Sequence, residues 1–234
     1  MRTSDFFDVE AGQWSERYSR DSRFRRRFEK ITGLLDRILP TATSRALDVG
    51  CGTGIFSQYL ARKGWNVTAI DASPEMIEEA KNYELENRID FRTCVIENFD
   101  EAPNSFDLIL CLSMLEYIED DEAAIQKFCE WLKPGGLIVV SVPNKAGILR
   151  KMEGVIFGIR TATRDRLFGD RGEYLKFQKR QYTPFELDIL MRQFGFRKKR
   201  RMFLSGGLTN PRWLLPIVER RFWAAMYCGV YEKK

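Results

Sequence analysis

The segment Arg45–Gly54 constrains the fold of this chain more than any other part. Its sequence, RALDVGCGTG, runs a short apolar strand directly into glycines at positions 50, 52 and 54, and a helical pattern begins at Ile55. Glycine lets the backbone turn sharply and approach a ligand closely because it carries no Cβ. The helix that follows points unpaired N–H groups and the positive end of its dipole at the same place. The segment therefore predicts a ligand site after the first strand of a sheet.

Two acidic residues specify the kind of ligand. Asp48 lies two residues before the first glycine, and Asp71 follows the apolar run Trp65–Ile70. An acid at the end of the second strand is placed to accept hydrogen bonds from a ribose diol. The spacing G-x-G-x-G differs from the G-x-G-x-x-G of dinucleotide-binding enzymes. Because Asp48 would repel an anion and hold a cationic amino group, we predict an adenosine-containing cofactor with an amino group.

From residue 45 onward, short apolar strands alternate with amphipathic helices. This alternation favours a parallel, doubly wound α/β sheet with helices on both faces. The expected strands are 45–49, 66–70, 89–94, 106–111 and 137–142, with helices at 55–63, 74–82 and 121–132. A helix from Thr183-Pro184 to Gly195 and two strands at 196–203 and 224–231 would complete a seven-stranded sheet.

Residues 5–38 are expected to form one or two helices. Apolar side chains recur there at helical spacing and would form a buried stripe: Phe24, Phe28, Ile31, Leu35 and Ile38. Arg27 falls on the same stripe, and a charged residue on an apolar face needs a partner.

Composition and charge exclude several classes of protein. Hydrophobic residues make up 44% of the chain, which argues against disorder. There is no histidine, and the five cysteines form no C-x-x-C pair, so we expect reduced thiols and no metal site. Residues 1–10 lack a signal-peptide core, and no apolar run approaches the roughly 20 residues that span a bilayer. We therefore expect a cytoplasmic protein.

The charge is divided unevenly. Residues 1–144 contain 17 lysines and arginines against 25 acidic residues, whereas residues 145–234 contain 21 against 8. This division predicts an acidic body and a basic face aimed at an anionic partner, such as a membrane surface, a phosphorylated substrate or nucleic acid.

Four motifs between about residues 40 and 145 stand in the order used by one enzyme family. They are LDVGCGTG at 47–54, AIDASPEMI at 69–77, NSFDLIL at 104–110 and LKPGGLIVVSVPN at 132–144. In these motifs the chain resembles the class I S-adenosylmethionine-dependent methyltransferases. The resemblance implies a Rossmann-like methyltransferase fold, mostly parallel, with four parts: an N-terminal helical lid (1–44), a cofactor-binding core (45–144), an acceptor-side cap inserted after the fifth strand (145–182), and a C-terminal helix and strands (183–234).

The resemblance also implies which residues bind the cofactor, with S-adenosyl-L-methionine as methyl donor and S-adenosyl-L-homocysteine as product. Asp48 and the glycine turn would surround the methionine part, Asp71 would take the ribose hydroxyls, and an arginine or tyrosine of the lid would meet the carboxylate. The residues after the third strand would read adenine through backbone groups, and the end of the fourth strand would face the sulfonium. The predicted set is Tyr18, Arg27, Asp48, Gly50, Cys51, Gly52, Gly54, Asp71, Ala72, Met76, Val95, Ile96, Cys111 and Leu112.

The segment Ser113–Glu119 bears on catalysis. It resembles the S-x-L-E-H segment of ubiquinone-biosynthesis-type O-methyltransferases, but Tyr117 stands where those enzymes have histidine. A hydroxyl acceptor has to lose a proton, and a positioned base assists this step. Glu116 would act as the base, or Tyr117 would orient the acceptor; helix capping and packing against the sheet are the structural alternatives for both.

The sequence leaves the acceptor open. The wider resemblance favours a hydroxyl of a small or lipid-linked metabolite, whereas the missing histidine favours an amino group, for example on an amino sugar. A non-catalytic cofactor-binding domain and an RNA-modifying enzyme are further alternatives. The absence of an N-P-P-Y-type motif, with Ser113-Met114 in its place, argues against nucleic acid. Residues 145–180 mix apolar and basic residues, which suits either a lid over the acceptor or peripheral contact with the inner face of an anionic membrane.

Overall fold

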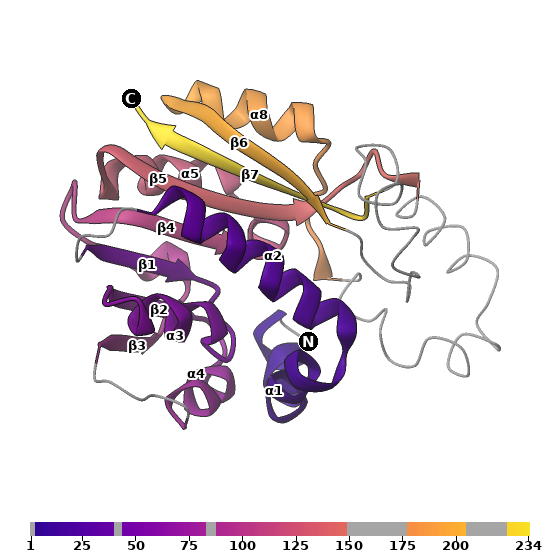
Figure 1. Cartoon of the computed structure of the whole chain (residues 1–234). Helices are drawn as coiled ribbons and strands as arrows, with labels where there is room; N and C mark the ends of the chain where they lie inside the picture. Colours follow the sequence, from indigo (N-terminus) through magenta and orange to yellow (C-terminus); the bar gives the residue numbers. More distant parts are fainter. Residues whose placement is uncertain (1–2, 40–43, 83–87, 149–176, 205–223) are drawn as a thin grey trace.

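The computed structural model describes residues 3–39, 44–82, 88–148, 177–204 and 224–234 (Figure 1). They form a seven-stranded sheet with the order β3-β2-β1-β4-β5-β7-β6. The strands from β1 to β5 run parallel, and β7 is antiparallel to both β5 and β6. The strands are β1 (Arg45–Val49), β2 (Asn66–Asp71), β3 (Ile89–Thr93), β4 (Phe106–Leu112), β5 (Leu132–Pro143), β6 (Phe196–Leu204) and β7 (Met226–Lys233). The predicted α/β, mostly parallel seven-stranded fold is confirmed.

Helices cover both faces of the sheet. One apolar core lies under α5 and α8, and a second lies under α2, α3 and α4. Adjacent β1 residues point to opposite cores, as a pleated strand requires: Leu47 contributes to the first and Ala46 to the second. The helices are α1 (Thr3–Arg20), α2 (Ser22–Ile38), α3 (Ile55–Arg62), α4 (Pro74–Lys81), α5 (Asp121–Trp131) and α8 (Pro184–Gln193), with short 3₁₀ turns η1 (Ile96–Asn98) and η2 (Leu115–Tyr117).

Local sequence signals explain where these helices begin. The Ser73 hydroxyl accepts the Met76 N–H at 3.1 Å, with Pro74 in the first turn of α4. Thr183 and Glu186 form a reciprocal capping box at the start of α8. Such side chains satisfy N–H groups that the helix itself leaves unpaired.

Two strands depart most from their predicted bounds. β5 begins at Leu132 rather than at 137, because Leu132 leaves α5 in an extended conformation and pairs with Phe106 of β4. Pairing then jumps to Leu108 with Leu137, so the Pro-Gly-Gly sequence forms an irregularity inside the strand. The last strand runs from Met226 to Lys233, two residues later than predicted.

Five basic residues, 197–201, lie on β6, which is an edge strand of the sheet. Residues 197–201 are all exposed, because a register shift between Lys198 and Arg200 interrupts the alternation of faces. The Arg197 and Lys199 side chains pair with Glu232, and Lys198 pairs with Asp188.

The expectations for the predicted cap concern residues that the structure largely does not describe. Residues 149–176 of the predicted cap and residues 205–223 lie outside the described residues, so membrane contact through residues 145–180 stays a prediction. Within the described ranges, none of the helices is both long and apolar enough to cross a bilayer.

Candidate active site

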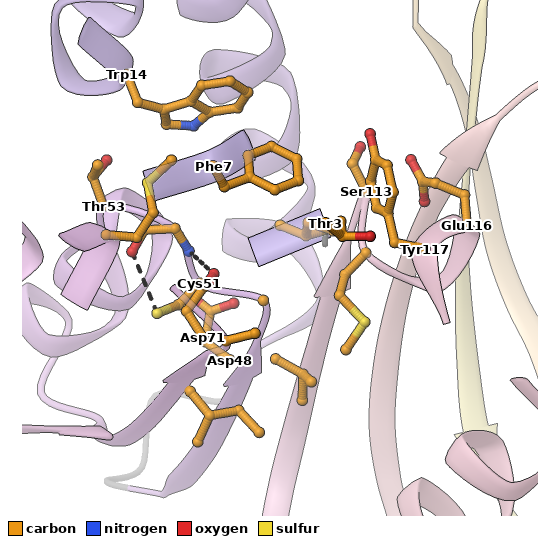
Figure 2. A pocket seen from close by; sticks show the side chains of 18 of the residues that line it. Thr3, Phe7, Trp14, Asp48, Cys51, Thr53, Asp71, Ser113, Glu116 and Tyr117 are labelled. Atoms are coloured by element: carbon orange, nitrogen blue, oxygen red, sulfur yellow. Dashed lines mark hydrogen bonds between the residues drawn. The ribbon is translucent and has the colours of Figure 1, made fainter. Parts of the chain in front are cut away.

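A cavity of about 920 Å³ opens at the carboxyl ends of β1, β2 and β4. Helices α1 and α2 contribute to its wall, and α1 brings Phe7 and Trp14 to it. Figure 2 shows polar side chains on two sides of this space, with Thr3 and Phe7 of α1 between them. We call the group Asp48, residues 50–52 and Asp71 the cofactor side, and the group Ser113, Glu116 and Tyr117 the acceptor side.

The glycine turn has the sharp backbone turn that its sequence predicts. Gly50 and Gly52 have φ values of 68° and 54°, in the left-handed region that favours glycine. The N–H groups of Gly50 and Cys51 both donate to the Ile70 carbonyl, at 2.9 and 3.0 Å, which ties the turn to β2. Gly50, Cys51 and Gly52 line the cavity, as does Ala72 beyond β2.

Gly54 has a different task. It is not among the residues that line the cavity. A Cβ at this position would approach the Phe91 ring to 2.9 Å and the Ala80 methyl to 3.2 Å. Gly54 therefore permits close packing beneath the turn, and the structure places it away from the predicted ligand.

Asp48 is a buried carboxylate on the cofactor side. It is 2% exposed and accepts a 2.6 Å hydrogen bond from the Ser57 hydroxyl of α3. Burial raises the pKa of Asp48 to about 7; the Ser57 hydrogen bond opposes this rise and the nearby Asp71 adds to it. A cationic group in the cavity would stabilise the ionised form of Asp48.

Asp71 closes β2 and joins the turn to α4. Its two carboxylate oxygens accept the N–H groups of Gly52, at 2.8 Å, and Ser73, at 3.0 Å. Burial raises the pKa of Asp71, and these backbone hydrogen bonds oppose the rise. A carboxylate has about four acceptor positions, so Asp71 keeps acceptor capacity for hydroxyl groups of a ligand.

The predicted lid residues Arg27 and Tyr18 both line the cavity. The Arg27 guanidinium donates to the Ser113 hydroxyl at 3.0 Å and to the Ser141 hydroxyl at 3.4 Å, while its buried Nε has no hydrogen-bond partner. Its hydrogen-bond partners in the described part of the chain are thus neutral. The charge on the apolar stripe of α2 is held by serines of β5 and of the segment after β4.

The predicted adenine region follows β3. Val95 and Ile96 line the cavity together with Met76 of α4. The Lys127 ammonium donates to the carbonyls of Ile96, at 3.2 Å, and of Glu97, at 2.9 Å, and this fixes the backbone of η1. Recognition of adenine by main-chain groups of this segment stays a prediction.

The structure separates the two residues predicted at the end of β4. Leu112 lines the cavity, whereas Cys111 is fully buried between β1 and β5 and does not line it. The prediction that Cys111 faces the sulfonium through its main-chain carbonyl stays a prediction, since Cys111 is not among the described residues that line the cavity. All five cysteines are free thiols.

The acceptor side lies directly after β4. Glu116 is 1% exposed and Tyr117 is half-buried, and both line the cavity. The Tyr117 ring meets the Phe7 ring of α1 edge to face, with centroids 5.6 Å apart. Ser113 has a φ of 59°, unusual for a residue with a side chain, and this turns the chain sharply into η2.

Sequence reasoning missed most of the contribution of α1. Thr3, Phe6, Phe7 and Trp14 line the cavity, and a Cβ on Gly52 would lie 3.7 Å from the Trp14 indole nitrogen. The available signal was the cluster of aromatic residues in a segment that otherwise lacks a strong apolar stripe. Gln178, at the end of the predicted cap, also lines the cavity and was missed as well.

The chain is similar in sequence to known proteins. Residues 23–199 match the family described as methyltransferase domain. The chain belongs to this family. A ubiquinone biosynthesis O-methyltransferase from Xylella fastidiosa is 42% identical over 114 residues, which make up 47% of this chain and 46% of that protein. A protein of the same name from Xanthomonas euvesicatoria is 42% identical over 110 residues, 46% of each chain. This methyltransferase domain thus spans about half the length of the curated relatives it matches.

Solved structures extend the likeness over the whole chain. The magnesium protoporphyrin IX methyltransferase of Synechocystis PCC 6803, solved with bound S-adenosylhomocysteine, superposes with a TM-score of 0.73 at 16% identity, covering 99% of this chain and 98% of that one. An N-methyltransferase from Bradyrhizobium japonicum, also solved with S-adenosylhomocysteine, gives 0.66 at 18% identity, covering 100% and 99%. At these identities the likeness shows the fold. The predicted methyltransferase family is confirmed. Both of these solved structures hold S-adenosylhomocysteine, the product of the predicted cofactor, S-adenosylmethionine.

The cavity of this methyltransferase domain fits that cofactor. The buried Asp48 carboxylate can accept a cationic amino group, and Asp71 keeps acceptor capacity for ribose hydroxyls. The cavity volume lies at the upper end of the roughly 300–1,000 Å³ usual for small-molecule sites, which leaves space for an acceptor as well.

Proposed function

We propose that this chain transfers a methyl group from S-adenosylmethionine to a hydroxyl of a small or lipid-linked metabolite. One observation carries the proposal: the buried Glu116 and the neighbouring Tyr117 face the cavity opposite Asp48 and Asp71 (Figure 2). The relatives that are named O-methyltransferases match nearly half of the chain and support a hydroxyl acceptor.

In this proposal the two sides of the cavity have separate roles. Bound S-adenosylmethionine supplies a methyl group on a positively charged sulfur. Asp48 would hold the amino group of the cofactor and Asp71 its ribose, which would fix the direction of the methyl group. The Glu116 carboxylate would accept the proton of the acceptor hydroxyl. The methyl group would pass from sulfur to the acceptor oxygen as the carbon–sulfur bond breaks, which leaves S-adenosylhomocysteine. Helix α1 covers the cavity and excludes water.

A methyl-transfer assay with matched probes tests the proposal. Catechol offers hydroxyl groups only, and glucosamine offers an amine beside hydroxyls; the position of the transferred methyl is read by mass spectrometry. We expect methylation on oxygen. Methylation on nitrogen alone contradicts the proposal, and tight S-adenosylhomocysteine binding with no transfer to any probe or metabolite extract favours the non-catalytic alternative.

The variant Glu116→Gln tests the base directly. It keeps the size of the side chain and removes its ability to take a proton, so kcat is expected to fall by roughly 10²–10⁴-fold. Because Glu116 lies on the acceptor side, the affinity for S-adenosylhomocysteine, measured by calorimetry, should stay within about twofold. Full activity of this variant would remove Glu116 from the mechanism.

A second candidate, methyl transfer to an amine, is supported by the charge of the cavity. Among the described residues that line it, Arg27 is the one basic side chain, against seven acidic ones: Glu10, Asp21, Asp48, Asp71, Glu97, Glu116 and Glu119. Such a lining attracts a cation. For an amine acceptor, the methylation rate should rise with pH as the free amine forms, and Glu116→Gln should cost less than for a hydroxyl acceptor.

A further inference from the structure

The chain that returns from the predicted cap lies directly against the acceptor side. Gln178 lines the cavity, and the ring of Phe177 lies 5.2 Å from that of Phe6 in α1. The backbone N–H groups of Lys179 and Arg180 both donate to the Glu116 carbonyl, at 2.8 and 3.3 Å. The carbonyl of the proposed base is therefore held by residues more than sixty positions further along the chain.

The segment that carries Glu116 needs such outside support. It begins with the left-handed Ser113, which is a costly conformation for a residue with a side chain. Its own turn is short, and it is closed by the Tyr117 N–H to the Met114 carbonyl at 2.9 Å. A single 3₁₀ turn has few hydrogen bonds of its own, so contacts from elsewhere decide where its side chains point.

A buried side-chain cluster fixes the returning segment. Asp121, the first residue of α5, is 2% exposed and accepts hydrogen bonds from the Tyr182 hydroxyl and the Arg180 guanidinium. The negative charge of Asp121 is also favoured by the N-terminus of its helix. Tyr182 is 3% exposed, and burial together with Asp121 raises the pKa of its hydroxyl, so it stays a donor.

Tyr182 also meets the start of the cap. Its backbone forms a parallel bridge with Asn144, and its carbonyl accepts the Lys145 N–H at 2.9 Å. Asn144, fully buried, donates from its side chain to the Ala224 carbonyl at 2.9 Å. The two ends of the segment 145–181 are thus joined at one residue, and that residue is hydrogen-bonded to the helix that follows the acceptor side.

We propose that Tyr182 and Asp121 are positioning residues: their hydrogen bond holds the returning segment 177–182 against the Glu116 carbonyl and so sets the geometry of the acceptor side. The proposal deepens the proposed function, since Glu116 is the base there. The structural coupling itself does not depend on the identity of the acceptor.

Amide hydrogen exchange on the full chain, followed by mass spectrometry, tests the coupling. Tyr182→Phe removes one hydrogen bond to a charged group, so exchange in residues 113–118 and 178–181 is expected to accelerate about tenfold or more. Tyr231→Phe is the matched control: its hydroxyl also donates to a carboxylate, Asp188, at 2.8 Å, from a buried position remote from the cavity. This control should leave both segments unchanged.

Equal exchange in Tyr182→Phe and the unmodified protein overturns the proposal, as does an acceleration spread evenly over the whole sheet. Asp121→Asn provides a second variant, which keeps an acceptor for Tyr182 and loses the charge; we expect a smaller acceleration in the same two segments. If Tyr182→Phe does not fold, absence of this local effect in Asp121→Asn overturns the proposal.

Kinetics separate positioning from general destabilisation. With whichever probe the unmodified enzyme methylates, Tyr182→Phe should lower kcat by about tenfold while S-adenosylhomocysteine affinity changes less than twofold. A parallel loss of cofactor affinity contradicts a role confined to the acceptor side. If neither a probe nor a metabolite extract is methylated, the proposed function fails, whereas the exchange experiment still decides whether the coupling exists.

Discussion

The cofactor side and the acceptor side of the cavity are built from different kinds of contact. The cofactor side comes from a single strand–turn–helix–strand unit, residues 45–71, and backbone hydrogen bonds to Ile70 and Asp71 hold it. The acceptor side gathers α1, the segment after β4 and residues 177–182, which are far apart in the chain. The residues of the first come from one continuous stretch of chain, whereas the second is contacted by the returning segment at the Glu116 carbonyl and by α1 at the Tyr117 ring. The two sides thus differ in how far along the chain their supporting contacts lie.

The largest effect is expected where the two sides touch. A Cβ on Gly50 would lie 2.5 Å from Met114 Cγ and 2.8 Å from its Cβ, and φ is 68°. Gly50→Ala should therefore distort both sides and lower S-adenosylhomocysteine affinity about 100-fold or more, measured by calorimetry. Gly64→Ala is the control, with a φ of 88° and no atom within 4 Å of its Cβ. Equal effects of the two variants would show that the contact between the sides is unimportant.

Asp48→Asn is expected to raise the stability of the ligand-free protein and to weaken ligand binding on the cofactor side. The carboxyl has a pKa of about 7 in the folded protein against 3.8 ordinarily, so between these values the folded state keeps a proton that the unfolded state has lost. Stability therefore falls as pH rises through this window, by up to roughly 4 kcal/mol above pH 7. We expect the ligand-free variant to melt at a higher temperature than the unmodified protein at pH 8, and by a smaller margin at pH 5.

Binding should change in the opposite direction. Loss of the charge that faces the amino group is expected to weaken S-adenosylhomocysteine by about 30-fold at pH 8. Methylthioadenosine, which lacks the amino-acid part, should bind equally to both proteins. A variant that is less stable at pH 8 and binds the product as before contradicts the role of Asp48.

The variant Arg27→Ala tests whether the guanidinium contributes to binding on the cofactor side or on the acceptor side. The prediction that it meets the methionine carboxylate implies about a tenfold loss of S-adenosylhomocysteine affinity, with methylthioadenosine unaffected. Its hydrogen bonds to Ser113 and Ser141 connect it instead with the strands nearest the acceptor side. Unchanged affinity for both ligands, with weaker acceptor binding in the kinetic assay, would move Arg27 to the acceptor side.

The smallest effect is expected from Tyr117→Phe. The Tyr117 ring keeps its edge-to-face contact with Phe7 in this variant, and the change removes one hydroxyl. If the hydroxyl only orients the acceptor, kcat should fall about threefold. A fall in kcat as large as that expected for Glu116→Gln would instead indicate that Tyr117 takes part in the proton transfer.

The sequence allowed prediction of the sheet and of most of the cofactor side because both depend on short-range patterns. Asp48, Gly50, Gly52 and Asp71 lie where a strand, a turn and a helix place them in any protein with this local order. The glycine pattern did not predict the role of Gly54. Its role in close packing becomes visible only from the positions of Phe91 and Ala80.

The rest depends on tertiary contacts. Nothing near Tyr182 in the sequence indicates that it bonds to Asp121, and nothing near Arg27 indicates two serines 86 and 114 positions away. The cavity wall formed by α1 depends likewise on how that helix docks. The spacing of Phe7, Trp14 and Tyr18 places them on one helical face, but it does not say what that face meets. These contacts arise from packing that local propensities do not encode.

The bridge between Asn144 and Tyr182 has a consequence for how such enzymes diversify. Adjacent strands lie about 5 Å apart, so the intervening piece leaves and re-enters the domain at nearly one point. An exchange of that piece for another of different length or composition would leave the strands and the methyl-donor site in place. Chimeras joined at these two residues offer a direct route to new acceptor specificities.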